Sequence, residues 1–144
     1  MKLIREFHTH SAEETIAAGG QLAKDLLPGQ MIILHGELGA GKTTLVKGIA
    51  EGFEAAPQEE VTSPTFALVH EYRGPKVTLF HIDLYRIDTD RELATIGLDD
   101  LRQEPRSLVL VEWGEKFESV KSQGNGEISI ERIGENARKI VYRK

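Results

Sequence analysis

Short apolar runs recur along the chain, separated by turn residues and by longer stretches with helical spacing. Seven of these runs either alternate between apolar and polar residues or are almost continuously apolar, as strands are. They cover residues 2–7, 31–35, 66–72, 77–85, 107–115, 127–133 and 138–144. The nearly unbroken run MIILH at 31–35 is typical of a central strand buried on both faces.

The first helix is predicted by its capping residues. Ser11 precedes Glu14 by three positions, which is the spacing of a capping box, and the helix is expected to run to about Leu27. Gly19 and Gly20 weaken this helix, because each glycine inside a helix costs about 1 kcal/mol relative to alanine. We therefore expect the pair to mark close packing against a neighbouring element.

A second helix follows from the spacing of apolar residues. Leu45, Ile49 and Phe53 recur at helical intervals. They predict a helix over 43–53 that ends near Gly52.

Further helical stretches are shorter. The acidic segment 88–105 has a helical start, is interrupted by Gly97 and stops at Pro105. Residues 114–120 also have helix-like spacing. The chain therefore carries three or four helices.

Two pairs of strands are joined by short turns. The turn 73–76, RGPK, joins 66–72 to 77–85, and the residues GENA at 134–137 join the last two strands, so both pairs are expected to be hairpins. The remaining strands alternate with helices. This order predicts one α/β domain over residues 1–144, with a mixed sheet of about seven strands flanked by helices.

Composition supports an ordinary folded domain. The chain has 144 residues, of which 40% are hydrophobic and 28% charged, and its formal net charge is −5. Cysteine is absent, which excludes disulfides and thiolate zinc sites. No apolar run approaches the roughly 18 residues of a membrane span. We expect a cytoplasmic protein without a zinc site, which does not bind a membrane and contacts nucleic acid only through a partner.

The segment GELGAGKTT carries the clearest chemistry. It matches G-x-x-x-x-G-K-[ST], with a strand before it and a helix after it. Backbone N–H groups of such a loop surround phosphate oxygens, its lysine reaches the β and γ phosphates, and the next hydroxyl ligates Mg²⁺. The motif predicts a P-loop NTPase-like fold that binds ATP and Mg²⁺. The residues assigned to nucleotide binding are Gly36, Gly39, Ala40, Gly41, Lys42, Thr43 and Thr44.

A metal on a triphosphate also needs a carboxylate at the end of a neighbouring strand. Glu112 ends LVLVE and Asp83 ends LFHID, and spacing alone does not rank them. Each is a candidate metal ligand with Thr43, and each is a candidate catalytic residue with Lys42. The alternative is that an acid simply ends a strand at the solvent edge.

The segment TSPTF is a candidate switch. Its hydroxyls, from Thr62, Ser63 and Thr65, are able to approach a γ-phosphate or its metal, and Pro64 stiffens the loop. An ordinary polar loop explains the same residues equally well.

Four other residues have two interpretations each. Trp113 packs in the core, which is favoured, or lies near the nucleotide. His81 is favoured as a structural histidine over a catalytic base. Arg86 and Arg138 are candidate phosphate or base contacts, although a solvated surface position is favoured for both.

The motifs GELGAGKTT, TSPTF, HIDLYR and VEWGE occur in this order within a short chain. In this respect the sequence resembles the TsaE (YjeE) family, the bacterial ATPases of tRNA threonylcarbamoyladenosine biosynthesis. The resemblance covers nearly the whole chain. Four ordered motifs are far more specific than the glycine-rich loop alone.

The resemblance implies a P-loop ATPase that works with TsaB and TsaD, the pair that transfers the threonylcarbamoyl group to adenosine 37 of certain tRNAs. The family member binds on the TsaD side with ATP near the contact, and its hydrolysis resets the complex between rounds. By position, Lys42 and Thr43 are the phosphate and Mg²⁺ residues and Glu112 is the second Mg²⁺ acid. Asp83 lies in the functional HxDxYR segment. The remaining matches are Arg138, a late nucleotide contact preceded here by Asn-Ala instead of glycine, and the switch residues Thr62 and Thr65.

Several activities are compatible with the glycine-rich loop. An ATPase with slow turnover alone is favoured, because no arginine finger is evident in the chain. A small-molecule kinase needs an acceptor pocket and a lid, for which the chain has little spare length. A GTPase needs an Asn-Lys-x-Asp motif, which is absent. A nucleotide-gated binding module without hydrolysis is the main alternative that is not an enzyme.

Overall fold

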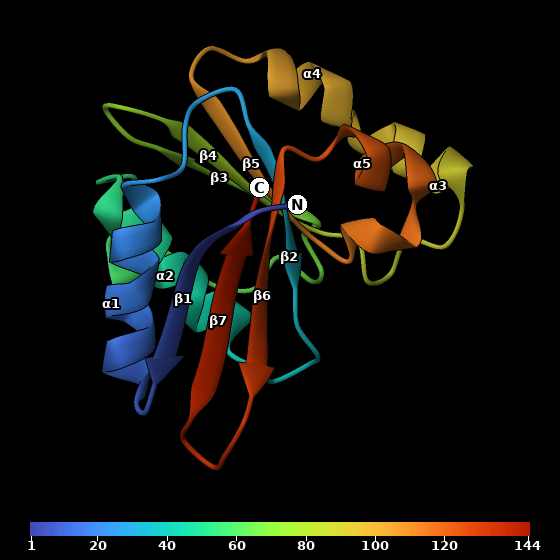
Figure 1. Ribbon diagram of the computed structural model, residues 1–144. Coiled ribbons are helices and arrows are strands. Elements are labelled where there is room, and N and C mark those ends of the chain that lie inside the picture. The colour runs from blue at the N-terminus through green and yellow to red at the C-terminus, as the bar shows by residue number, and fades with distance from the viewer.

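The computed structural model describes residues 1–144, and its seven strands form one mixed sheet in the order β1-β7-β6-β2-β5-β4-β3 (Figure 1). The α/β class and the seven-stranded mixed sheet are as predicted. The strands are β1 Leu3–Thr9, β2 Met31–His35, β3 Val69–Arg73, β4 Thr78–Asp83, β5 Ser107–Glu112, β6 Gly126–Arg132 and β7 Arg138–Arg143.

The centre of the sheet is parallel and its edges are antiparallel. Strands β6, β2, β5 and β4 run in one direction, while β3, β7 and β1 pair in the opposite direction to their neighbours. Both predicted hairpins, β3–β4 and β6–β7, are confirmed. Strand β3 begins at Val69 and not at residue 66, because Leu68 adopts a left-handed φ of 69° and its N–H closes a turn onto Pro64 O.

Helices cover both faces of the sheet (Figure 1). None of these helices combines the length and the hydrophobicity that a membrane span requires. One face carries α1 and α2, and the other carries α3, α4 and α5. The bounds are α1 Ala12–Ala23, α2 Lys42–Gly52, α3 Asp90–Ile96, α4 Leu98–Gln103 and α5 Glu118–Gln123, with short 3-10 turns at Gln58–Glu60 and Gly114–Lys116.

Helix α1 begins as predicted and ends early. The Ser11 hydroxyl accepts a hydrogen bond from the Glu14 N–H, so Ser11 is the N-cap. The helix stops at Ala23, four residues before the predicted Leu27. Its final N–H groups bond three residues back, which tightens the last turn, and the proline after Leu27 disfavours a helical conformation there.

The glycine pair in α1 divides into two roles. A Cβ on Gly19 would lie 2.4 Å from the Leu45 carbonyl oxygen and 2.9 Å from Gly48 Cα, both in α2. A Cβ on Gly20 would have no atom nearer than 3.9 Å. Close packing between α1 and α2 therefore explains Gly19 and does not explain Gly20.

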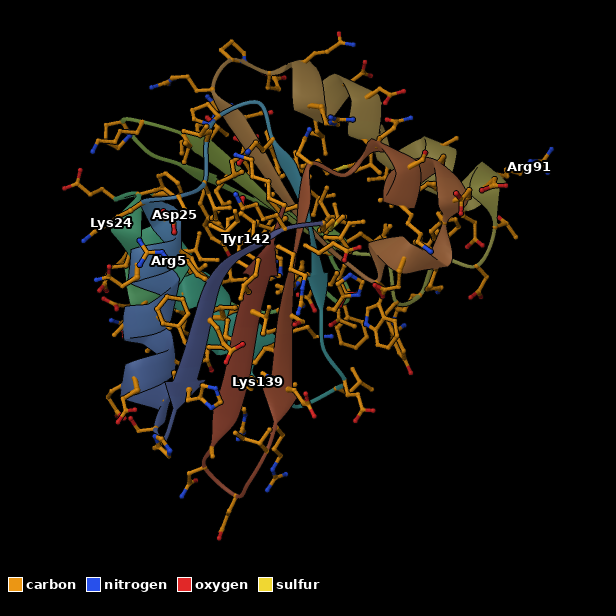
Figure 2. The ribbon with its side chains drawn as sticks, in the orientation of Figure 1. Arg5, Lys24, Asp25, Arg91, Lys139 and Tyr142 are labelled. Carbon is orange, nitrogen blue, oxygen red and sulfur yellow. The ribbon has the colours of Figure 1, made fainter.

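The core has two parts, one on each face of the sheet. In β2, Ile32 and Leu34 point toward α1 and α2, and Met31 and Ile33 point toward the opposite face. All four side chains are buried, as expected for a central strand. At the edge of the sheet, Arg5 of β1 lies 2.7 Å from Asp25, just beyond α1, and ties the edge strand to the helix (Figure 2).

The parallel strands bring three segments to one edge of the sheet. Leu34 near the end of β2 pairs with Glu112 at the end of β5, and Glu112 pairs with Asp83 at the end of β4. Directly paired residues on neighbouring strands share a face, so both carboxylates point toward α2. The loop between β2 and α2 therefore lies beside two acids.

Candidate nucleotide-binding site

The glycine-rich loop needs its glycines for backbone reasons. Gly39 and Gly41 have φ angles of 79° and 108°, a region that side chains disfavour. Gly36 has an ordinary φ, but a Cβ there would lie 2.9 Å from Ile130 Cγ2 and 3.0 Å from Ile130 O. Gly41 is also the N-cap of α2 and offers no side-chain cap. The first N–H groups of α2 are thus available to an anion.

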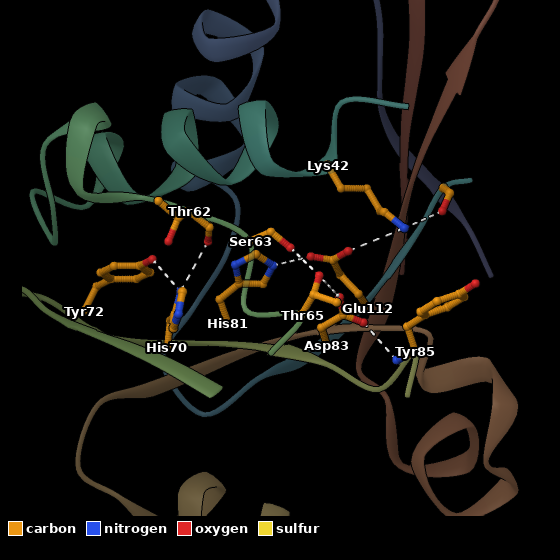
Figure 3. Close-up of polar contacts among 11 residues, drawn as sticks. Lys42, Thr62, Ser63, Thr65, His70, Tyr72, His81, Asp83, Tyr85 and Glu112 are labelled. Atoms are coloured by element: carbon orange, nitrogen blue, oxygen red, sulfur yellow. Dashed lines mark hydrogen bonds and ion pairs between the residues drawn. The ribbon is translucent and has the colours of Figure 1, made fainter. Parts of the chain in front are cut away.

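Lys42 is the first residue of α2 and is almost fully buried. Its ammonium group donates a hydrogen bond to Gly36 O and lies 3.4 Å from Glu112 Oε1 (Figure 3). It also lies 4.9 Å from the centroid of the Trp113 ring. The positive charge of Lys42 therefore lies between the loop carbonyl of Gly36 and the Glu112 carboxylate.

Glu112 is held from two sides. Lys42 contacts Oε1, and the ring nitrogen Nε2 of His81 donates a hydrogen bond to Oε2 (Figure 3). Burial by itself raises the pKa of Glu112, but the hydrogen bond from His81 and the charge of Lys42 outweigh burial, and the pKa lies below its ordinary value. Glu112 is therefore ionised at neutral pH.

Asp83 has a different set of partners. The Thr65 hydroxyl donates to Oδ2 at 3.0 Å, and the Tyr85 N–H donates to Oδ1 at 2.8 Å. Asp83 is 4% exposed and Glu112 is 3% exposed, so neither acid lies at a solvent edge. Both belong to one buried polar cluster beside the loop.

The TSPTF segment reaches this cluster through one residue. Ser63 Oγ lies 2.7 Å from Thr65 Oγ1, whose own proton goes to Asp83. The Thr62 carbonyl oxygen accepts a hydrogen bond from His70 in β3 (Figure 3). Thr62 and Ser63 are exposed. Of the three hydroxyls, only that of Thr65 contacts a carboxylate.

Trp113 faces both the core and the loop. It is partly buried against the apolar side chains on the α3–α5 face, as favoured from the sequence. Its left-handed backbone, with φ of 63°, turns the ring toward Lys42 and onto Tyr85, at 5.3 Å between ring centroids. The ring borders a cavity of about 730 Å³ together with loop residues 36–40. Trp113 therefore packs on the core and also borders the glycine-rich loop.

The two arginines take different places. Arg138 in β7 donates a hydrogen bond from Nε to Ala40 O at 2.8 Å, which ties the glycine-rich loop to strand β7. Arg86 lies over the ring of Phe66, 4.3 Å from its centroid, in the TSPTF region. Arg86 is exposed, as favoured from the sequence. Arg138 is partly buried and its guanidinium group bonds to the loop backbone, so it is not a freely solvated surface residue.

One group of residues at the cavity was not singled out from the sequence. His35, at the end of β2, lies 2.9 Å from Glu115 and 3.3 Å from Glu127 of β6. The contact with Glu115 raises the pKa of His35 above its ordinary value, although burial opposes this. His35 directly precedes the loop and Glu115 ends VEWGE, so both were adjacent to recognised motifs. Their pairing depends on the fold.

The oxygen donors at the site suit Mg²⁺ bound through a nucleotide. Thr43 in the first turn of α2 supplies a hydroxyl, and Asp83 and Glu112 supply carboxylates. No group of three or more His, Asp or Glu side chains is arranged to hold a metal without help. Mg²⁺ commonly takes one or two carboxylates and completes its shell with water and phosphate oxygens. These residues therefore fit a metal that arrives with a triphosphate.

The strand, glycine-rich loop and helix at the carboxyl edge of a parallel sheet define an α/β protein with a P-loop-like fold. A family model described as "Threonylcarbamoyl adenosine biosynthesis protein TsaE" matches residues 9–140. The chain belongs to the TsaE family. This confirms the resemblance drawn from the four motifs.

Individual relatives agree with this assignment. Proteins of Bacillus subtilis and Aquifex aeolicus, both named tRNA threonylcarbamoyladenosine biosynthesis protein TsaE, are 36% and 37% identical to the chain. The first match covers 95% of this chain and 84% of the relative, and the second covers both completely. The crystal structure of Bacillus subtilis YdiB is similar with a TM-score of 0.72 and 31% identity, over 99% of this chain and 86% of that one.

Proposed function

We propose that the protein is a Mg²⁺-dependent ATPase that acts with TsaB and TsaD in the modification of adenosine 37 of tRNA, where its hydrolysis sustains multiple turnovers. The observation that carries this proposal is the convergence of Lys42, Glu112 and Asp83 at one edge of the sheet, beside a glycine-rich loop. Family membership supports the pathway.

The loop is proposed to bind the triphosphate. Its N–H groups and the first turn of α2 surround the phosphate oxygens. Lys42 exchanges its contacts with Gly36 O and Glu112 for the β and γ phosphates. Arg138 keeps the loop in shape through Ala40 O. The binding residues are Gly36, Gly39, Ala40, Gly41, Lys42, Thr43, Thr44, Thr65 and Arg138.

The two acids are proposed to have different roles, one in metal binding and one in orienting water. Thr43 and Glu112 would hold Mg²⁺, with Asp83 beside them, and the bound metal would neutralise negative charge on the phosphates. Asp83 orients the attacking water and accepts its proton, since it lies on the Thr65 side of the cluster, away from Lys42. Lys42 and the loop N–H groups stabilise the charge that builds up on the transferring phosphoryl group.

Partners are proposed to complete the site. Arg138 donates to Ala40 O and Arg86 packs over Phe66, so neither guanidinium group is free to act as an arginine finger. Turnover alone should then be slow. Large apolar side chains are exposed around the site, namely Leu38, Phe66 and Tyr85, and they suit contact with a protein partner.

The net charge of −5 agrees with a protein that meets tRNA through other subunits. We also propose a cytoplasmic location, because a protein of tRNA modification needs access to tRNA. A nucleotide-gated binding module remains the second candidate. The observation in its favour is the Thr65–Asp83 hydrogen bond, which connects the TSPTF loop to the site without requiring hydrolysis.

Nucleotide titration tests the binding step. Trp113 is the single tryptophan and borders the cavity, so its fluorescence should change when Mg·ATP binds. We expect a saturable change with ATP, a much weaker one with GTP, and none in Lys42→Ala. An equally strong change in Lys42→Ala would show that the nucleotide does not occupy the glycine-rich loop.

A further inference from the structure

His81 is a polar residue in an apolar place. It lies in the middle of β4 with no exposed surface, and the strand neighbours Phe80 and Ile82 are fully buried apolar side chains. Burying an imidazole costs free energy unless it makes hydrogen bonds. A leucine or valine at this position would fill the space at a lower cost. A specific interaction is therefore needed to explain the histidine.

The only side-chain hydrogen bond of His81 is the one to Glu112. Nδ1 is buried and has no partner, while Nε2 contacts Glu112 Oε2 (Figure 3). An ionised carboxylate only accepts, so Nε2 carries the proton and donates it. The ring is thus oriented toward a single acceptor that lies on the neighbouring strand, 31 residues away in the chain.

Glu112 also interacts with Lys42. Its other oxygen, Oε1, lies 3.4 Å from the Lys42 ammonium group. That distance is longer than a direct charged hydrogen bond, which is about 2.7–2.9 Å. With His81 in place, the carboxylate is divided between two donors. Without His81, the whole carboxylate would be free to turn onto Lys42.

We propose that His81 is a positioning residue, which holds the Glu112 carboxylate in the orientation that binds Mg²⁺ and prevents it from closing onto Lys42. The inference rests on the proposed Mg·ATP site. Partners behind a metal ligand fix its direction, and their loss commonly costs about 10–100-fold in metal affinity or activity. His81 itself contacts neither nucleotide nor metal in this account.

Substitutions that differ in reach separate positioning from packing. In His81→Gln the amide nitrogen takes a position close to that of Nε2 and is able to donate to Glu112. In His81→Asn the amide is one carbon shorter and falls near the Nδ1 position, away from Glu112. His81→Leu removes the donor and keeps an apolar side chain. Leu79→Ala is the matched control, since Leu79 is buried on the same face of β4 without contacting Glu112.

The first readout is the Mg²⁺ concentration that half-saturates the Trp113 fluorescence change, measured with a non-hydrolysable ATP analogue. We expect His81→Asn and His81→Leu to raise it by about tenfold or more, and His81→Gln to stay within about threefold of the unsubstituted protein. Leu79→Ala should lower thermal stability and leave the Mg²⁺ dependence unchanged. Phosphate release from ATP is the second readout. As Mg²⁺ is raised to saturation, release should recover first in His81→Gln and only at higher Mg²⁺ in His81→Asn and His81→Leu.

The outcomes are distinguishable. An unchanged Mg²⁺ requirement in His81→Asn or His81→Leu overturns the positioning role while leaving the ATPase proposal intact. Equal losses in His81→Gln and His81→Asn also overturn it, because both keep a polar group and only one keeps the donor in place. If His81→Leu does not fold, the Gln and Asn pair still decides. Failure of the unsubstituted protein to respond to Mg·nucleotide overturns the proposed function and this inference with it.

Discussion

The contact between Lys42 and Glu112 gives a prediction about stability that does not depend on any ligand. Both side chains are more than nine-tenths buried and their charged atoms lie 3.4 Å apart. Removal of one partner leaves the other charge buried without its counter-charge. We therefore expect Lys42→Met and Glu112→Gln each to destabilise the protein, and the double variant to recover most of the loss.

The magnitude follows from the distance. At an effective dielectric constant of about 20, two unit charges 3.4 Å apart attract by about 5 kcal/mol. Desolvation of both groups opposes this gain by several kcal/mol, and His81 keeps one hydrogen bond to Glu112 after Lys42 is removed. Each single substitution should thus cost about 2 kcal/mol, with a coupling energy of about 3 kcal/mol between them.

Urea unfolding followed by far-ultraviolet circular dichroism measures the four proteins of the cycle, with equal m-values as the check for two-state behaviour. The double variant should lie within about 1 kcal/mol of the unsubstituted protein, because neither charge then remains buried alone. Single costs that add within about 0.5 kcal/mol would refute the reasoning, since the two groups would then not interact.

Three further substitutions test other parts of the structure. Gly19→Ala should lose about 1–3 kcal/mol in urea unfolding, because its Cβ meets a carbonyl of α2, whereas Gly20→Ala should be neutral or stabilising; equal effects would contradict the packing described. His35→Gln should remove stability that is present below the ordinary pKa of 6.5 and is lost as pH rises through the raised folded pKa. The stability difference from the unsubstituted protein should therefore be larger at about pH 6 than at about pH 9, and Glu115→Gln should reduce this pH dependence. Thr65→Ala should weaken ATP-dependent binding to the TsaB–TsaD pair more than ATP binding itself, and equal losses would count against a switch role for the TSPTF loop.

Local sequence patterns predicted most of the secondary structure. The Ser11 cap, the apolar run of β2 and the two hairpins depend on neighbouring residues, and all are present. Element ends were less accurate. The end of α1 depends on how its last turn tightens, and the start of β3 depends on the left-handed φ of Leu68. Neither has a periodic signal in the sequence.

The site was predictable where a motif and a topological rule were enough. The glycine-rich loop and two acids at strand ends had to meet, because parallel strands place their carboxyl ends together. The partners of those acids were not predictable. The bond from His81 to Glu112 and the contact of His35 with Glu127 join residues on different strands, so strand order and register decide them.

We propose above that Lys42 and its neighbours form an ATPase site that a protein partner completes. The most direct measurement is single-turnover phosphate release from Mg·ATP by the protein alone and with the TsaB–TsaD pair, using Lys42→Ala as the blank. We expect slow release alone, strong stimulation by the pair, and loss of both in Lys42→Ala. Release that is as fast without the pair as with it would contradict a site completed by the partner, and release that survives in Lys42→Ala would contradict the site itself.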